Sequence, residues 1–209
     1  MDKLVNLSVR DYTDLLASLE PAPGGGSTAA LLAAQGAALT AMVCGLTLGK
    51  KKYEEHQALC SEVRSRADAL KGVFLDFVDR DTEAYGHMNR ALALPRDTEE
   101  DKAVRAMAMQ EALKLCTQTP YDLMEDIVRM ADLLLSVTGK SNASAASDLG
   151  VAALCLGAAV QGAWLNVLIN LGGIKDADFV RQYRQNGQML AQRVQAVADS
   201  VFTGIRDAL

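Results

Sequence analysis

A glycine run ahead of an uncharged segment is the first place in this sequence where chemistry could occur. Pro23, Gly24, Gly25, Gly26 and Ser27 form the run. Glycines let a ligand approach the backbone without meeting a Cβ atom, and free N–H groups at a helix start attract carboxylate or phosphate oxygens. No Gly-Lys-Ser/Thr follows, so the run is not a P-loop. It predicts either an anion-binding helix start or a plain turn between helices.

Two carboxylates have sequence neighbours that suit acid–base chemistry. Asp148 begins a stretch, residues 149–174, that carries no other charge. It either caps a helix start or, inside a cavity, holds a cationic intermediate and moves a proton. Asp81 and Tyr85 are four residues apart, so on a helix they share a face. That face is either part of a site or a solvated surface with one half-buried ring.

Lysines and asparagines supply candidate binding groups. The run Lys50–Lys52 follows the first uncharged segment. Its charges either complement a helix C-terminus in water or form a positive patch for an acidic substrate tail. Asn142 precedes Asp148 in a polar segment, and Asn166 and Asn170 share one face of the second uncharged segment. Buried amides need partners, which are either ligand atoms or neighbouring helices.

Composition argues against several other classes of protein. The net charge of −5 disfavours nucleic acid as the main partner. The four cysteines form no CxxC pair, which predicts neither a zinc site nor a redox motif. Free thiols of this kind are typical of a reducing cytoplasm, and the N-terminus lacks the pattern of a signal peptide. We therefore expect a cytoplasmic protein without a metal site.

The elements that must position these residues are helices. Apolar residues recur at helical spacing, aromatics are only 5% of the residues, and no strand alternation persists. We expect an all-α, single-domain bundle over residues 1–209. About seven helices are predicted, near residues 8–19, 27–48, 54–91, 98–116, 120–139, 148–171 and 176–206.

Two of these predicted helices, within residues 24–49 and 149–174, carry no charge and are long enough to span a bilayer. Polar and small residues are dispersed through both, which favours buried central helices of a soluble bundle over membrane spans. One small bundle cannot easily hide so much apolar surface. We therefore expect part of it to pack across a twofold homodimer interface.

The order and spacing of these motifs resemble those of one family, the formimidoyltetrahydrofolate cyclodeaminase domain. Its stand-alone bacterial relatives include methenyltetrahydrofolate cyclohydrolases. The resemblance extends from about residue 5 to 205. It is carried by Pro23–Ser27, Lys50–Lys52, Asp81–Tyr85 with Leu94-Pro95, Asn142 with Ser147–Ala152, and Asn166–Leu171.

The resemblance implies an all-α homodimer with a folate site near the subunit interface. It implies hydrolysis of 5,10-methenyltetrahydrofolate to 10-formyltetrahydrofolate, since no formiminotransferase domain is present in this sequence. The alternative reaction is that of a formimidoyltetrahydrofolate cyclodeaminase, which releases ammonia and forms the methenyl compound. An alternative of another class is a non-catalytic folate-binding helical dimer. The expected partners are a folate, with one glutamate or several, and a second copy of the chain.

The family chemistry also implies roles for single residues. Asp148 is expected to face the cationic one-carbon group, with Asp81 as the alternative carboxylate, and Lys51 is expected to assist proton transfer. Neither a metal nor a cofactor is implied, because the tetrahydrofolate derivative is itself the substrate. The expected substrate contacts are Gly24, Gly25, Gly26, Ser27, Lys52, Tyr85, Asn142 and Asn166.

Overall fold

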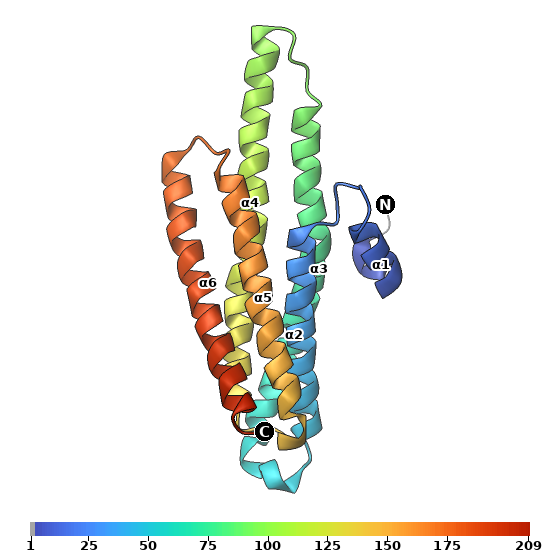
Figure 1. Cartoon of the computed structure of the whole chain (residues 1–209), viewed down its shortest axis with the longest axis vertical. Coiled ribbons are helices and arrows are strands. Elements are labelled where there is room, and N and C mark those ends of the chain that lie inside the picture. Colours follow the sequence, from blue (N-terminus) through green and yellow to red (C-terminus); the bar gives the residue numbers. More distant parts are fainter. Residues whose placement is uncertain (1–2) are drawn as a thin grey trace.

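The computed structural model describes residues 3–209 and shows helices without a strand in that range (Figure 1). The all-α prediction is confirmed. Consecutive long helices run in opposite directions, and the short α1 lies beside α3 at the edge of the bundle. The α-helices are α1 (Val9–Leu16), α2 (Gly25–Thr47), α3 (Gln57–Leu92), α4 (Glu99–Val137), α5 (Ala146–Leu171) and α6 (Ala177–Arg206). Short 3-10 turns are η1 (Leu4–Asn6), η2 (Lys51–His56) and η3 (Ala143–Ala145).

Local sequence signals explain where several helices begin and end. The Ser8 hydroxyl accepts a hydrogen bond from a backbone N–H of the first turn of α1. Thr98 and Asp101 form a reciprocal capping box at the start of α4. Gly49 and Gly139, with φ of +75° and +76°, lie just beyond the ends of α2 and α4, where a side chain would strain the backbone.

One predicted helix boundary is wrong. We expected a helix to end near Cys116 and another to begin at Pro120, but α4 continues through both residues. Proline cannot donate to the carbonyl four residues earlier, which here belongs to Cys116. Asn170 of α5 donates its side-chain N–H to that carbonyl at 3.0 Å. A tertiary contact thus replaces the missing backbone bond, and the described residues form six α-helices instead of about seven.

The two uncharged helices, α2 and α5, lie against each other, and α5 also packs on α4 and α6. Glycines bring these helices close: a Cβ on Gly36 would lie 3.0 Å from Leu156, and one on Gly162 would lie 3.2 Å from Ala29. Both helices are long and apolar enough to cross a membrane, yet 56% and 44% of their most apolar windows are buried inside the bundle. They therefore act as core helices with one face left uncovered.

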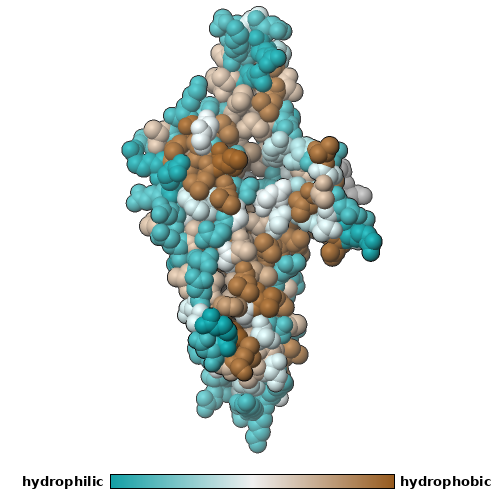
Figure 2. Space-filling view, in the orientation of Figure 1, coloured by the Kyte–Doolittle hydropathy of each residue, from teal (hydrophilic) through white to brown (hydrophobic). Residues whose placement is uncertain are grey.

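That uncovered face runs along α5 and the neighbouring part of α2. Figure 2 shows apolar residues gathered along the front of the bundle. Beyond its first turn, α5 contributes no charged residue to this face. A contiguous apolar surface of this kind is typical of an interaction site. Its large exposed members are Val151, Leu154, Leu165 and Ile169 on α5, with Met42 and Leu46 on α2.

The packing of α6 on α5 gives a test of this arrangement. A Cβ on Gly187 would lie 2.3 Å from the Trp164 ring, so Gly187→Ala must displace the indole. We expect a loss of about 1–3 kcal/mol in the free energy of unfolding, measured by urea denaturation. Gly204→Ala on the same helix meets nothing within 4 Å and should be neutral or slightly stabilising. Equal effects of the two substitutions would contradict the described packing.

Candidate functional site

The carboxylate of Asp81 on α3 is held against the first turn of α2. Its Oδ2 atom accepts hydrogen bonds from the Ser27 backbone N–H at 2.9 Å and the Ser27 hydroxyl at 3.2 Å. The same hydroxyl also lies 2.9 Å from the Val78 carbonyl oxygen, to which it can donate. Ser27 is fully buried; its backbone N–H donates to Asp81, and its single hydroxyl proton is divided between Asp81 and the Val78 carbonyl. The α2 helix dipole further favours a negative charge at this place.

The glycine run makes this contact possible. A Cβ on Gly26 would lie 2.1 Å from Asp81 Oδ1 and 2.4 Å from its carboxyl carbon, so only glycine fits beside the carboxylate. The N–H groups of Gly25 and Gly26 lie in the first turn of α2, where a helix has no internal acceptor for them. A Cβ on Gly25 would lie 3.2 Å from the Asn166 side chain of α5. The start of α2 therefore joins α3 and α5.

A cavity of about 300 Å³ opens at this junction, and we call it the Asp81 cavity. That volume is at the small end of the range for ligand pockets. Its walls come from the loop before α2, from α3, from α4 and from α5. The lining residues are Pro21, Ala22, Gly24, Gly25, Asp81, Thr82, Ala84, Tyr85, Cys116, Asn166, Ile169 and Asn170.

The polar groups of the Asp81 cavity suit proton transfer. Burial raises the pKa of Asp81 above its ordinary value, although the hydrogen bonds from Ser27 act in the opposite direction. Burial also raises the pKa of the neighbouring Cys116 thiol to about 11, which keeps it protonated. Asn166 donates to the Gly162 carbonyl at 2.9 Å, and its Oδ1 atom accepts no hydrogen bond from the described residues. A carboxyl group and an amide oxygen thus face one cavity.

The other predicted site residues lie at the opposite end of the bundle, which we call the lysine end: Lys50–Lys52, Asn142 and Asp148. The Ala143 N–H donates to the Tyr53 hydroxyl at 2.9 Å, and this bond, with the nearby lysines, lowers the pKa of Tyr53. Asn142 donates its backbone N–H to the Thr47 hydroxyl at 2.9 Å. These contacts join η2, η3 and the end of α2.

One chain does not bring the two groups together. Asp148 and Asn166 both belong to α5, and at 1.5 Å per residue they are about 27 Å apart along its axis. Asp148 lies half-buried in the first turn of α5 and makes no hydrogen bond or ion pair with the described residues. It therefore does not cap the helix. Lys51 and Lys52 are exposed.

Sequence reasoning missed two lining residues with polar side chains, Thr82 and Cys116, and each had a signal. Thr82 follows Asp81 directly, and Tyr85 lies between the two on the helical wheel. Cys116 precedes Pro120 by four residues, so its carbonyl needed a partner from elsewhere once the helix continued. Asn170 supplies that partner and reaches the Asp81 cavity as well. The expectation that the helix breaks before Pro120 hid Cys116 and the contact that Asn170 makes with it.

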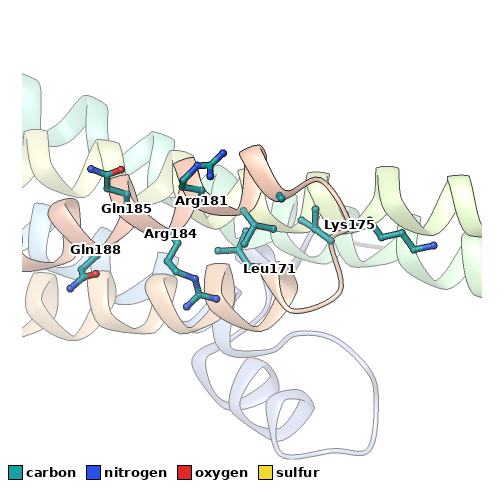
Figure 3. Close-up of a pocket in the computed structure, with 9 residues that line it drawn as sticks. Leu171, Lys175, Arg181, Arg184, Gln185 and Gln188 are labelled. Atoms are coloured by element: carbon teal, nitrogen blue, oxygen red, sulfur yellow. The ribbon is translucent and has the colours of Figure 1, made fainter.

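A wider groove of about 590 Å³ lies between the end of α5 and the start of α6 (Figure 3). Lys175, Arg181 and Arg184 line it, and Figure 3 shows the two arginines projecting in different directions. Arg181 is paired with Asp178. No acidic side chain lines this groove, so it offers no proton acceptor for the chemistry predicted above. Within residues 3–209 there is also no cluster of three or more His, Cys, Asp or Glu side chains.

Comparisons with known proteins agree on one family. The sequence model of the formiminotransferase-cyclodeaminase family matches residues 8–188. Methenyltetrahydrofolate cyclohydrolase from Methylorubrum extorquens is 36% identical over 96% of this chain and 97% of its own length. Formimidoyltransferase-cyclodeaminase from Sus scrofa is also 36% identical over 95% of this chain, which spans only 37% of the pig protein. The crystal structure of formiminotetrahydrofolate cyclodeaminase from Thermotoga maritima superposes with a TM-score of 0.82 at 26% identity, covering 96% of this chain and 98% of that one.

The raised pKa of Asp81 predicts a specific pH dependence of stability. An acid whose pKa is higher in the folded than in the unfolded state stabilises the fold at low pH, and this contribution is lost as the pH rises through the folded pKa. We therefore expect Asp81→Asn to gain stability relative to the natural protein as the pH rises from about 4 to about 8. Urea denaturation across that range measures the difference, and a difference that stays flat or falls would contradict the assignment.

Asp176→Asn provides the control of opposite sign. The hydrogen bond from Lys114 and that from the Phe179 N–H lower the pKa of Asp176. Its contribution is present above the unfolded pKa and is lost as the pH falls. The stability of Asp176→Asn relative to the natural protein should therefore fall with rising pH.

Proposed function

The chain belongs to the formiminotransferase-cyclodeaminase family, and we propose that it hydrolyses 5,10-methenyltetrahydrofolate to 10-formyltetrahydrofolate. The observation that carries this proposal is the Asp81 carboxyl, held by the Ser27 N–H, in one cavity with Gly25 of the first turn of α2. The Methylorubrum extorquens relative, which matches over nearly its full length, supports this reaction over others of the family. The methenyl carbon already carries positive charge, so water can add to it without a metal or a redox cofactor.

Asp81 is the acid–base group in this proposal. Its carboxylate takes one proton from a water molecule while the water oxygen bonds to the methenyl carbon, which neutralises the cation. The protonated carboxyl then delivers that proton to N5 as the bond between N5 and the carbon breaks. Loss of the hydroxyl proton to solvent completes the formyl group on N10. The raised pKa of Asp81 suits both steps, because a group that acts first as a base and then as an acid works best when its pKa is near the operating pH.

The first turn of α2 and the Asn166 amide support the same steps. The Gly25 N–H lies in the first turn of α2 and lines the cavity, so it can donate to a carbonyl or carboxylate oxygen of the substrate beside Asp81. Asn166 Oδ1 is free to accept a hydrogen bond from the attacking water. Tyr85, half-exposed at the rim, offers a ring surface to the bound substrate.

The working unit in this proposal is a twofold dimer. Ile169 lines the Asp81 cavity and is also 77% exposed on the uncovered face of α5, so the cavity opens onto that face. A twofold axis across the middle of α5 brings two such faces together and reverses their ends. The lysine end of one copy then approaches the Asp81 cavity of the other. This arrangement would reunite motif residues that lie about 27 Å apart in one chain.

The roles of Asp148, Lys51 and Lys52 follow from that arrangement. The ammonium groups of a partner copy would meet the glutamate carboxylates of the folate, with one glutamate or several. Asp148 of the partner copy would add negative charge near the cationic one-carbon bridge. Asn142 is buried at the same end and donates to the Thr47 hydroxyl, so in this proposal it would support that side of the substrate site.

The alternative function is that of a formimidoyltetrahydrofolate cyclodeaminase. The Thermotoga maritima structure and the Sus scrofa relative carry that activity in their names. The same carboxyl would then protonate the departing ammonia as N10 attacks the formimino carbon. A non-catalytic folate-binding dimer is the remaining alternative, and it would bind folate with neither activity.

A paired assay on the purified protein distinguishes these functions. We expect the absorbance of 5,10-methenyltetrahydrofolate to disappear on addition of the protein, with little ammonia release from 5-formiminotetrahydrofolate. Asp81→Asn should lower kcat by about 10²- to 10⁴-fold, because it removes the proton-transfer group. Asp76→Asn, an exposed change on the same helix, should leave kcat unchanged. Full activity of Asp81→Asn, or folate binding without either reaction, would refute the proposal.

Subunit complementation tests the shared site. Asp81→Asn and Asp148→Asn should each inactivate the homodimer, which sedimentation should detect as the main species. When the two variants are co-expressed, half of the dimers combine one chain of each kind and contain one intact site. Total activity should then recover to about a quarter of the natural level. No recovery in a confirmed mixed dimer would place the whole site within one chain.

A further inference from the structure

A second cavity, of about 600 Å³, lies under the N-terminal arm, by which we mean residues 3–22. The arm lies beside α3 at the edge of the bundle (Figure 1). The arm contributes Lys3, Leu4, Leu15, Glu20, Pro21 and Ala22, and α3 contributes Asp79, Thr82, Glu83, Tyr85, Gly86 and Asn89. We call this space the arm cavity.

The arm cavity and the Asp81 cavity are two parts of one cleft. Pro21, Ala22, Thr82 and Tyr85 line both. On α3, Asp79 and Glu83 face the arm, and Asp81 faces the start of α2. Thr82 and Tyr85 lie between these two sides of the helix. A ligand whose reacting atom lies at Asp81 can therefore extend past Thr82 into the arm cavity.

Two side chains that line the arm cavity each have a buried oxygen without a hydrogen-bond partner among the described residues: Asp79 Oδ2 and Thr82 Oγ1. The other oxygen of Asp79 accepts the Leu4 N–H at 2.7 Å, so the carboxylate is held in place. The Val78 carbonyl, the usual acceptor for a helical threonine hydroxyl at position 82, lies within hydrogen-bonding distance of Ser27. Buried polar groups without partners are rare, and a bound ligand is one way to satisfy them.

The charge of the arm cavity selects which end of a folate it can hold. Asp79, Glu20 and Glu83 line it against the single cation of Lys3. These acids would repel the glutamate end of the substrate. Carboxylate acceptors between apolar walls suit a flat ring whose edge carries N–H donors. The pterin ring of tetrahydrofolate has such an edge, formed by its 2-amino group and N3–H.

We propose that the arm cavity is the pterin subsite, with Asp79 accepting from the 2-amino group and N3–H and Thr82 contacting the ring between Asp79 and Asp81. This inference rests on the proposed folate function and adds the orientation of the substrate. The one-carbon bridge then lies at Asp81. The aminobenzoyl-glutamate end leaves past Gly24 and Ile169 toward the face that a partner copy covers.

Fragment inhibition tests this orientation. The probes are 6-methyltetrahydropterin, which has the ring without the tail, and p-aminobenzoylglutamate, which has the tail without the ring. In the dimer, Asp79→Asn should weaken inhibition by the pterin fragment about ten- to hundred-fold. The substitution replaces two carboxylate oxygens, both acceptors, by one amide oxygen and one NH₂ group that can only donate. Inhibition by p-aminobenzoylglutamate should not change. Asp76→Asn, one turn earlier and exposed, should affect neither probe.

Thr82→Val provides the second variant, because Asp79 also anchors the arm through Leu4. It keeps the shape of the side chain and removes only the hydroxyl, and it should weaken the pterin fragment several-fold with the tail fragment unaffected. Loss of tail binding with pterin binding intact in both variants would reverse the orientation and overturn the proposal. Unchanged inhibition by both fragments would overturn it as well. A natural protein without activity or folate binding would instead refute the proposed function, so the two failures are distinguishable.

Discussion

The contact between the Asp81 carboxylate and the first turn of α2 is the constraint from which the rest of the site follows. A carboxylate removed from water is costly unless hydrogen bonds and a helix dipole compensate for the loss. Here the Ser27 backbone N–H supplies one such bond, the Ser27 hydroxyl divides its proton between Asp81 and the Val78 carbonyl, and Gly26 leaves the space in which the carboxylate lies. The compensation is incomplete, because burial still raises the pKa of Asp81. A carboxyl held in place yet easily protonated is the combination that proton transfer requires.

The uncharged helix α5 connects this site to the remainder of the molecule. One side of it forms the core between α2, α4 and α6, and the opposite side is an apolar face open to water. Two amide side chains lie near the C-terminal end of α5. Asn166 faces the Asp81 cavity, and Asn170 supplies the hydrogen bond that Pro120 removes from α4. The proline therefore costs the helix little, and the replacement bond ties α4 to α5 beside the cavity.

The sequence was informative wherever a local pattern determines local structure. Helical spacing and the absence of strand alternation predicted the all-α fold, and breakers placed most boundaries within a few residues. The prediction failed at Pro120, because the bond that rescues the helix comes from a residue far along the chain. The same limit applied to the carboxylates. Asp148 and Asp81 were both recognisable candidates, but nothing local shows that only Asp81 contacts the start of α2.

The sequence by itself determined the set of chemical groups and the family to which their order belongs, because the spacing of motifs along the chain can be recognised without knowing which residues are in contact. The tertiary structure alone decided how those groups divide, with the glycine run, Asp81, Tyr85 and Asn166 at one end and Lys51, Lys52, Asn142 and Asp148 at the other. The physical reason is the rigidity of a long helix. Residues at the two ends of α5 are held about 27 Å apart, and only packing between helices, within a chain or between copies, can bring distant groups into contact.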